Sequence, residues 1–122
     1  MSRVLAGALF LFVSAALIVT ASARAQEGAD PAKGKPLYLM YCVTCHGELG
    51  DGQGPVGKTL DPPPRDFTQG DFKYGNSDQE LFDLISNGAA AKGGSALMAP
   101  WGAVIPEGDR WSIVKYIRTL KK

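Results

Sequence analysis

The order of apolar and polar residues predicts helices, and no strand pattern of any length appears in the chain. The first helix runs toward Tyr41, because Asp30 suits the N-cap and Pro31 the first helical position. Pro36 still lies near the start of this helix, where a missing N–H does least harm. The residues at helical spacing are Gly34, Leu37, Tyr38 and Tyr41.

Two more helices are predicted nearer the C-terminus. Ser77 and Glu80 form a capping box and Gly88 suits the position after a helix end, so a helix is expected over residues 77–87. Its apolar stripe consists of Leu81, Leu84 and Ile85. The last helix should begin between Pro106 and Asp109. Its apolar residues are Trp111, Ile113, Val114, Tyr116, Ile117 and Leu120.

Two long segments are expected to be irregular. Residues 47–75 contain many glycines and the run Pro62-Pro63-Pro64, and residues 89–104 are rich in glycine and small side chains. Such long loops are unusual in a compact domain unless they enclose a large ligand. The chain is therefore predicted to be all-α, with three or more helices and long loops.

The first 25 residues have the pattern of a secretory signal peptide. Arg3 precedes an apolar run over residues 4–19, and Ala23-Arg24-Ala25 has the small-x-small pattern of a cleavage site. We predict cleavage near Ala25, which divides the chain into a signal peptide (1–25) and a periplasmic domain (26–122). The alternative is a retained membrane anchor, although the run is short for a span of roughly 20 residues.

Charge and cysteine content narrow the function. The net charge is +1 and there is no basic stripe, which argues against a nucleic-acid partner. The two cysteines, Cys42 and Cys45, lie three apart and are followed at once by His46. Cys-x-x-Cys-His is the attachment pattern of c-type haem, in which both sulfurs bind the porphyrin and the histidine binds iron.

Other chemistries fit these three residues less well. A thioredoxin-like dithiol would require a βαβ setting, which the chain lacks. A zinc site would need four ligands, and the chain offers two cysteines and one histidine. A structural disulfide, common in exported proteins, would leave His46 and the long loops unexplained.

Elimination suggests the second axial ligand. His46 is the single histidine, and methionine is the usual partner in electron-carrying cytochromes c. Met1 belongs to the signal peptide, and Met40 lies two residues before Cys42, where we assign it to packing on the proximal side. Met98 remains, in the second loop and just before Ala99-Pro100, although a methionine can also simply fill a gap in a core.

Residues 52–59 match the P-loop pattern Gly-x4-Gly-Lys-Thr and also contain Gly-x-Gly-x-x-Gly. Both phosphate-binding patterns require a strand before and a helix after. The haem motif stands before this segment and three prolines stand after it. We therefore predict that it binds no phosphate.

Taken together, these motifs resemble the monohaem cytochrome c family with the mitochondrial-cytochrome-c-like (class I) fold, over residues 30–120. The resemblance rests on the attachment site at 42–47, the glycine-rich and proline-rich segments at 50–54 and 62–67, the strap at 98–101 and the last helix. It implies that the first and last helices cross near a right angle, with Gly34 allowing close approach. It also implies that a carbonyl of Pro62, Pro63 or Pro64 accepts the His46 ring N–H, and that Arg65, Tyr74 and Trp101 are candidates for contacts with the haem propionates.

The function expected from these residues is that of a single-electron carrier with one haem c, not an enzyme, because His46 and Met98 would fill both axial positions. Its partners would be transient: a donor dehydrogenase or cytochrome complex, and an acceptor oxidase or reductase. A membrane would be involved only if the N-terminal segment is retained. Two alternatives stay open: a gas-binding, sensory or weakly peroxidatic haem protein, and the cytochrome subunit of a dehydrogenase complex.

Overall fold

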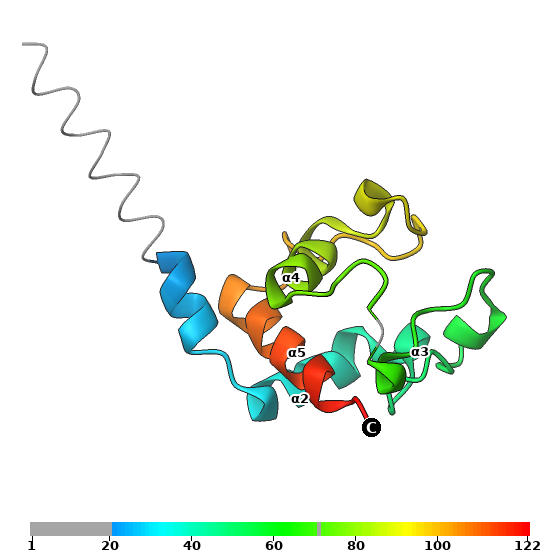
Figure 1. Ribbon diagram of the computed structural model, residues 1–122, viewed down its shortest axis with the longest axis horizontal. Coiled ribbons are helices and arrows are strands. Elements are labelled where there is room, and N and C mark those ends of the chain that lie inside the picture. Colours follow the sequence, from blue (N-terminus) through cyan, green and yellow to red (C-terminus); the bar gives the residue numbers. More distant parts are fainter. Residues whose placement is uncertain (1–20, 71) are drawn as a thin grey trace, which may run out of the picture.

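The computed structural model describes residues 21–70 and 72–122, and Figure 1 shows that they form helices joined by long loops. The longer helices are α2 (Pro31–Tyr41), α4 (Asp78–Asn87) and α5 (Glu107–Thr119), and a short α3 (Val43–His46) follows α2. Three single-turn 3-10 helices lie within the loops: Gly57–Thr59, Phe67–Gln69 and Ala90–Lys92. Residues 21–27 are also helical, and the described residues contain no strand, so the all-α prediction is confirmed.

The predicted helix starts are confirmed at atomic detail. The Asp30 side chain accepts a hydrogen bond from the Ala32 N–H at 2.9 Å, and Pro31 is the first residue of α2. The Ser77 hydroxyl accepts from the Glu80 N–H, and the Glu80 carboxylate accepts from the Ser77 N–H, which completes the capping box of α4. Both caps satisfy backbone donors that the first turn of a helix leaves without a partner.

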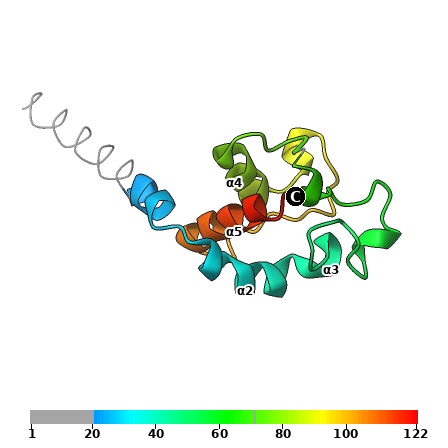
Figure 2. The same cartoon turned by 60° about the horizontal axis from the view of Figure 1, so that its bottom comes forward.

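The closest helix contact joins α2 to α5. A Cβ atom on Gly34 would lie 2.0 Å from the carbonyl oxygen of Ser112, so only glycine allows this approach. Lys33 and Asp109 form an ion pair across the contact at 2.9 Å, and the rings of Tyr38 and Tyr116 lie 5.2 Å apart. Figure 2 shows the two helices side by side, with the loops to one side of them.

The core lies between α2, α4 and α5, and two loop phenylalanines complete it. It consists of Tyr38, Phe67, Phe72, Leu81, Ile85, Ile105, Trp111, Ile113, Val114 and Ile117. Ile113 is 0% exposed, and full burial of such a side chain contributes roughly 1.5–3 kcal/mol to stability. Because Phe67 and Phe72 come from loops, this core also anchors the irregular half of the molecule.

Two predictions about the first 41 residues have different outcomes. The apolar run of the predicted signal peptide lies outside the described residues, and within residues 21–70 and 72–122 no helix has the length and hydropathy needed to cross a membrane. The assignment of Met40 to packing is wrong, since 69% of this residue is exposed. It occupies the outer face of α2 and does not contribute to the core cluster.

Candidate haem site

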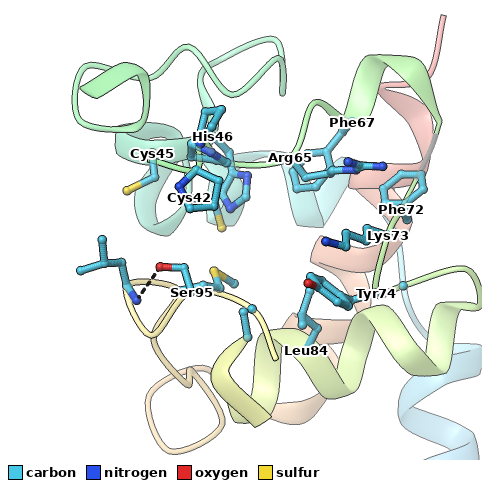
Figure 3. A pocket seen from close by; sticks show the side chains of 18 of the residues that line it. Cys42, Cys45, His46, Arg65, Phe67, Phe72, Lys73, Tyr74, Leu84 and Ser95 are labelled. Carbon is cyan, nitrogen blue, oxygen red and sulfur yellow. Dashed lines mark hydrogen bonds between the residues drawn. The ribbon is translucent and has the colours of Figure 1, made fainter. Parts of the chain in front are cut away.

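A largely apolar cavity of about 630 Å³ lies between the helices and the loops. This volume is in the usual range for cofactor sites. Figure 3 shows Cys42, Cys45 and His46 together on one side of it, with Arg65, Phe67, Phe72, Lys73 and Tyr74 on another. Met98 and Trp101 also line it, from the loop that follows α4. One short segment therefore contributes three of the four predicted site residues to the cavity lining, and a distant segment contributes Met98.

The local fold places both cysteines and His46 on the cavity wall. α2 ends at Tyr41 and is capped by Cys42, whose N–H donates to the Tyr38 carbonyl at 2.8 Å, and the single turn of α3 follows. Within that turn the His46 N–H donates to the Cys42 carbonyl at 2.9 Å. Gly47 then reverses the chain with a positive φ of 78°, and its carbonyl accepts from the buried Tyr38 hydroxyl at 2.7 Å. These bonds fix the attachment motif to the end of α2.

The glycine-rich segment after the motif packs against it from outside. The Gly52 N–H donates to the His46 carbonyl at 2.9 Å, and the Val56 N–H donates to the Thr44 carbonyl at 3.0 Å. A Cβ atom on Gly57 would lie 1.8 Å from the carbonyl oxygen of Cys45. Glycine is therefore required for close packing against the motif. The glycines of the pattern that resembled a P-loop thus serve close packing against the attachment motif. The sequence alone had not suggested this role.

Burial sets the protonation states of Cys42 and His46. Burial, together with a smaller effect of nearby Cys45, raises the pKa of Cys42 to about 12. Reactive dithiols of the thioredoxin type have lowered thiol pKa values, so this site has the opposite character. Burial also lowers the pKa of His46 to about 4, against a smaller opposing effect of the Arg65 backbone. At neutral pH the imidazole is uncharged, which is the form that binds a metal.

The contacts of the His46 ring differ from those that the family resemblance implied. A hydrogen bond with the backbone of Arg65, the residue after the three prolines, raises the pKa of the ring against the effect of burial. The buried Nδ1 atom nevertheless makes no hydrogen bond of normal length and angle. Phe67 instead stacks on the ring, with centroids 4.7 Å apart and planes inclined by 16°. Phe67 and Phe72 were not predicted as site residues, because only tertiary packing brings them to His46.

Met98 is the described methionine that lines the cavity. It is half-buried, and it also borders a smaller apolar cavity of about 60 Å³ together with Cys42 and His46. Its carbonyl accepts a hydrogen bond from the Ala89 N–H at 3.1 Å, and Gly88 packs closely against the same oxygen. These contacts anchor the strap at the end of α4. Met40, by contrast, lines neither cavity.

Polar groups line part of the apolar cavity, and Figure 3 shows Arg65, Lys73 and Tyr74 on one side of it. Arg65, Tyr74 and Trp101, which were candidates for propionate contacts, all line it, and Lys73 joins them. The Lys73 ammonium lies 5.0 Å from the centroid of the Tyr74 ring. Cationic and hydroxyl groups beside an apolar wall suit a flat, mostly apolar ligand that carries carboxylates.

The donor set fits covalently bound haem better than the other candidates. Cys42 and Cys45 are free thiols and do not form the disulfide considered from sequence. Within residues 21–70 and 72–122, no group of three or more His, Cys, Asp or Glu side chains is placed so that it could hold a metal ion. Two free thiols, a neutral buried imidazole and a thioether instead border one apolar cavity, as an attached haem requires.

Comparisons with known proteins agree with this site. Over residues 29–117 the sequence matches the family described as "Cytochrome C oxidase, cbb3-type, subunit III". The "Cbb3-type cytochrome c oxidase subunit CcoP" of Azospirillum brasilense is 29% identical over 103 residues, which cover 84% of this chain and 32% of that protein. "Cytochrome c-554(547)" of Halothiobacillus neapolitanus is 36% identical over 96 residues, which cover 75% of this chain and 98% of that protein. The chain thus spans about a third of the first relative and nearly all of the second.

A solved structure shows the same fold. A chain of the Kuenenia stuttgartiensis reducing HAO-like protein complex superposes with a TM-score of 0.64 at 31% sequence identity, covering 73% of this chain and 41% of that chain. The chain therefore belongs to the c-type cytochromes, within the cytochrome c domain family that it matches, and its cofactor is one covalently bound haem c.

Proposed function

We propose that this protein is an exported single-electron carrier in which Cys42 and Cys45 attach the haem and His46 and Met98 bind its iron. The observation that carries the proposal is that these four residues border one cavity, although Met98 comes from a distant segment. When bound, haem supplies the one-electron oxidation and reduction. The side chains described above supply attachment, axial ligands and an apolar surround.

The two proposed axial ligands have different roles. His46 is partly buried and uncharged at neutral pH, so its ring needs to lose no proton before it binds iron. Met98 offers a thioether, a ligand that raises the reduction potential of a cytochrome c. With both axial positions filled by protein, no open position is left for a substrate or a gas, and the protein acts by electron transfer without catalysing a reaction.

Exposed apolar residues on the two loops support a small docking surface for redox partners. Leu49 is 60%, Val56 44% and Leu97 68% exposed, and Leu97 also lines the cavity. We infer that partners dock where the loops of residues 47–59 and 96–103 approach the haem edge. Redox encounters of this kind typically bury less than about 1,200 Å², which permits fast release.

A second candidate is the cytochrome subunit of a larger redox complex. It is favoured by the match to one part of an oxidase subunit and by the likeness to a chain of a complex. The coverage of nearly all of cytochrome c-554(547) favours an independent carrier. Size analysis of native extracts separates the two, since a carrier migrates alone and a subunit migrates with a permanent partner.

Export to the periplasm is part of the proposal and rests on the N-terminal sequence pattern. Intact-mass analysis of the periplasmic protein is expected to show a start near Gln26 and the added mass of one haem. A membrane-bound product that begins at Met1 would instead support the retained anchor.

Optical spectroscopy tests the carrier function. The haem is expected to stay with the protein during acid–acetone extraction, because thioether bonds hold it. The spectrum of the reduced protein is expected to change little under carbon monoxide, because Met98 fills the sixth position. Ready binding of carbon monoxide would contradict the carrier proposal and favour the gas-binding alternative.

A further inference from the structure

His46 is the first member of a row of stacked side chains that the electron-carrier proposal does not use. The Phe67 ring lies parallel to the imidazole to within 16°, with centroids 4.7 Å apart. The Phe72 ring lies behind Phe67 at 5.7 Å and 15°. The guanidinium carbon of Arg118 lies 4.4 Å from the centroid of Phe72. Phe67 and Phe72 are each only 6% exposed, so the middle of the row is almost entirely excluded from solvent.

The orientation of the imidazole needs such a support. The side-chain torsion that turns a histidine ring is broad, so rotamer preference alone does not fix its plane. In most metal-binding histidines a hydrogen bond from the second ring nitrogen does so. Here the hydrogen bond between the ring and the Arg65 backbone falls outside normal geometry, so the stacked ring of Phe67 is a second contact that restricts the plane.

Phe67 is itself held by the backbone around it. Its N–H donates to the Gly50 carbonyl at 2.7 Å, which ties it to the loop that follows His46. The carboxylate of Asp66 accepts from the Thr68 N–H at 2.9 Å and fixes the single helical turn that begins at Phe67. These backbone hydrogen bonds hold the segment from which the Phe67 ring projects toward the imidazole.

The far end of the row is anchored to two helices. Arg118 on α5 donates to the carboxylate of Asp78 on α4 at 2.9 Å and to the Gly75 carbonyl at 3.0 Å. These bonds hold the guanidinium over Phe72, which in turn backs Phe67. An unbroken set of contacts thus runs from the contact between α4 and α5 to the imidazole.

We propose that Phe67 is the positioning residue for the axial imidazole: its ring, backed by Phe72 and Arg118, sets the imidazole plane and so tunes the haem iron. This inference rests on the proposed ligation by His46. The orientation of an axial ligand is one of the means by which a protein adjusts the electronic state and potential of haem iron. Removal of the ring should therefore change spectroscopic properties as well as stability.

The test compares Phe67→Leu with Phe67→Tyr and with Phe82→Leu in the haem-loaded protein. Phe82 is a matched control, because its ring stacks on Trp111 at 4.1 Å and lines neither cavity. The measurements are the g values of the oxidised protein by electron paramagnetic resonance and the reduction potential. Phe67→Leu is expected to shift both beyond the range of wild type and Phe82→Leu, and Phe67→Tyr to restore the g values toward wild type.

Each result decides the inference. If Phe67→Leu lowers the unfolding temperature as Phe82→Leu does but keeps wild-type g values and potential, Phe67 is only a core residue and the inference is overturned. A wild-type protein without a low-spin signal would overturn the proposed ligation and the inference with it. A further measurement uses the wild-type protein alone. In its reduced form, nuclear Overhauser effects are expected between the ring protons of His46 and Phe67. Their absence would contradict the stack.

Discussion

The contact between α2 and α5 and the loops around the cavity are built in different ways. At the helix contact, Gly34 meets the Ser112 carbonyl so closely that no side chain fits between them. The loops instead surround about 630 Å³ of largely apolar space. A protein interior is normally packed without such voids. The helix contact is therefore complete in the polypeptide alone, whereas the loop half requires its cofactor to complete its core.

The largest effect is expected from removing the attachment sites. A double variant, Cys42→Ala with Cys45→Ala, should hold no covalent haem and lose cooperative unfolding, because total stability is only about 5–15 kcal/mol and the cavity would stay unfilled. Hydrogen exchange should show protection lost throughout residues 47–70, 72–75 and 88–104, with any remaining protection in α2 and α5. Native-like protection of both halves would refute the contrast between them.

A smaller effect is expected at the helix contact. Gly34→Ala should destabilise the protein by about 1–3 kcal/mol, because the added methyl group overpacks the α2–α5 contact. The haem spectrum should stay unchanged, since the contact lies outside the cavity lining. The measurement is denaturant unfolding followed by circular dichroism.

Gly108→Ala on α5 is the matched control for that variant. A Cβ atom there would meet nothing within 4 Å, so the change should be neutral or stabilise by roughly 0.5–1 kcal/mol through helix propensity. Equal destabilisation by both substitutions would show that close approach at Gly34 is not the reason for its glycine.

The smallest effect concerns the ion cluster that connects α4 to α5. Hydrogen bonds from Lys115 and then Arg118 hold the pKa of Asp78 below its ordinary value of 3.8. The folded-state pKa is depressed, so this stabilisation is fully present above the unfolded pKa and is lost as pH falls through the folded pKa. Asp78→Asn should reduce stability at pH 7 by about 1 kcal/mol or less, because the group is partly exposed. The free energy of unfolding, measured at several pH values between pH 7 and strongly acid pH, should depend less on pH in the variant than in wild type. An equal dependence on pH in both proteins would contradict the assignment.

The helices could be predicted from sequence because their signals are local. Asp30-Pro31 and the Ser77–Glu80 box mark helix starts within a few residues, and both are formed in the structure. The short α3 was not predicted, since four residues carry no periodicity. Its location between α2 and the Gly47 turn comes from packing, as the bond from Tyr38 to Gly47 shows.

Residues of the site that belong to a short sequence motif could be predicted. Residues that reach the site only through tertiary contacts could not. Cys42, Cys45 and His46 were predicted from their spacing and Met98 by elimination, and all four line one cavity in the structure. The stack of Phe67 on His46 joins two loops and has no sequence signature. The glycines at 54 and 57 were noticed only as a misleading pattern, because their role depends on the carbonyl groups of the motif against which they pack.

The central claim is that Met98 binds the haem iron, and one comparison of variants tests it most directly. The oxidised wild-type protein should show the weak near-infrared sulfur-to-iron band, and Met98→Ala should lose it and have a lower potential, because a thioether ligand raises the potential. Met40→Ala is the matched control, since Met40 is 69% exposed and lines neither cavity, and it should keep both properties. Persistence of the band in Met98→Ala, or its loss in Met40→Ala, would contradict the account.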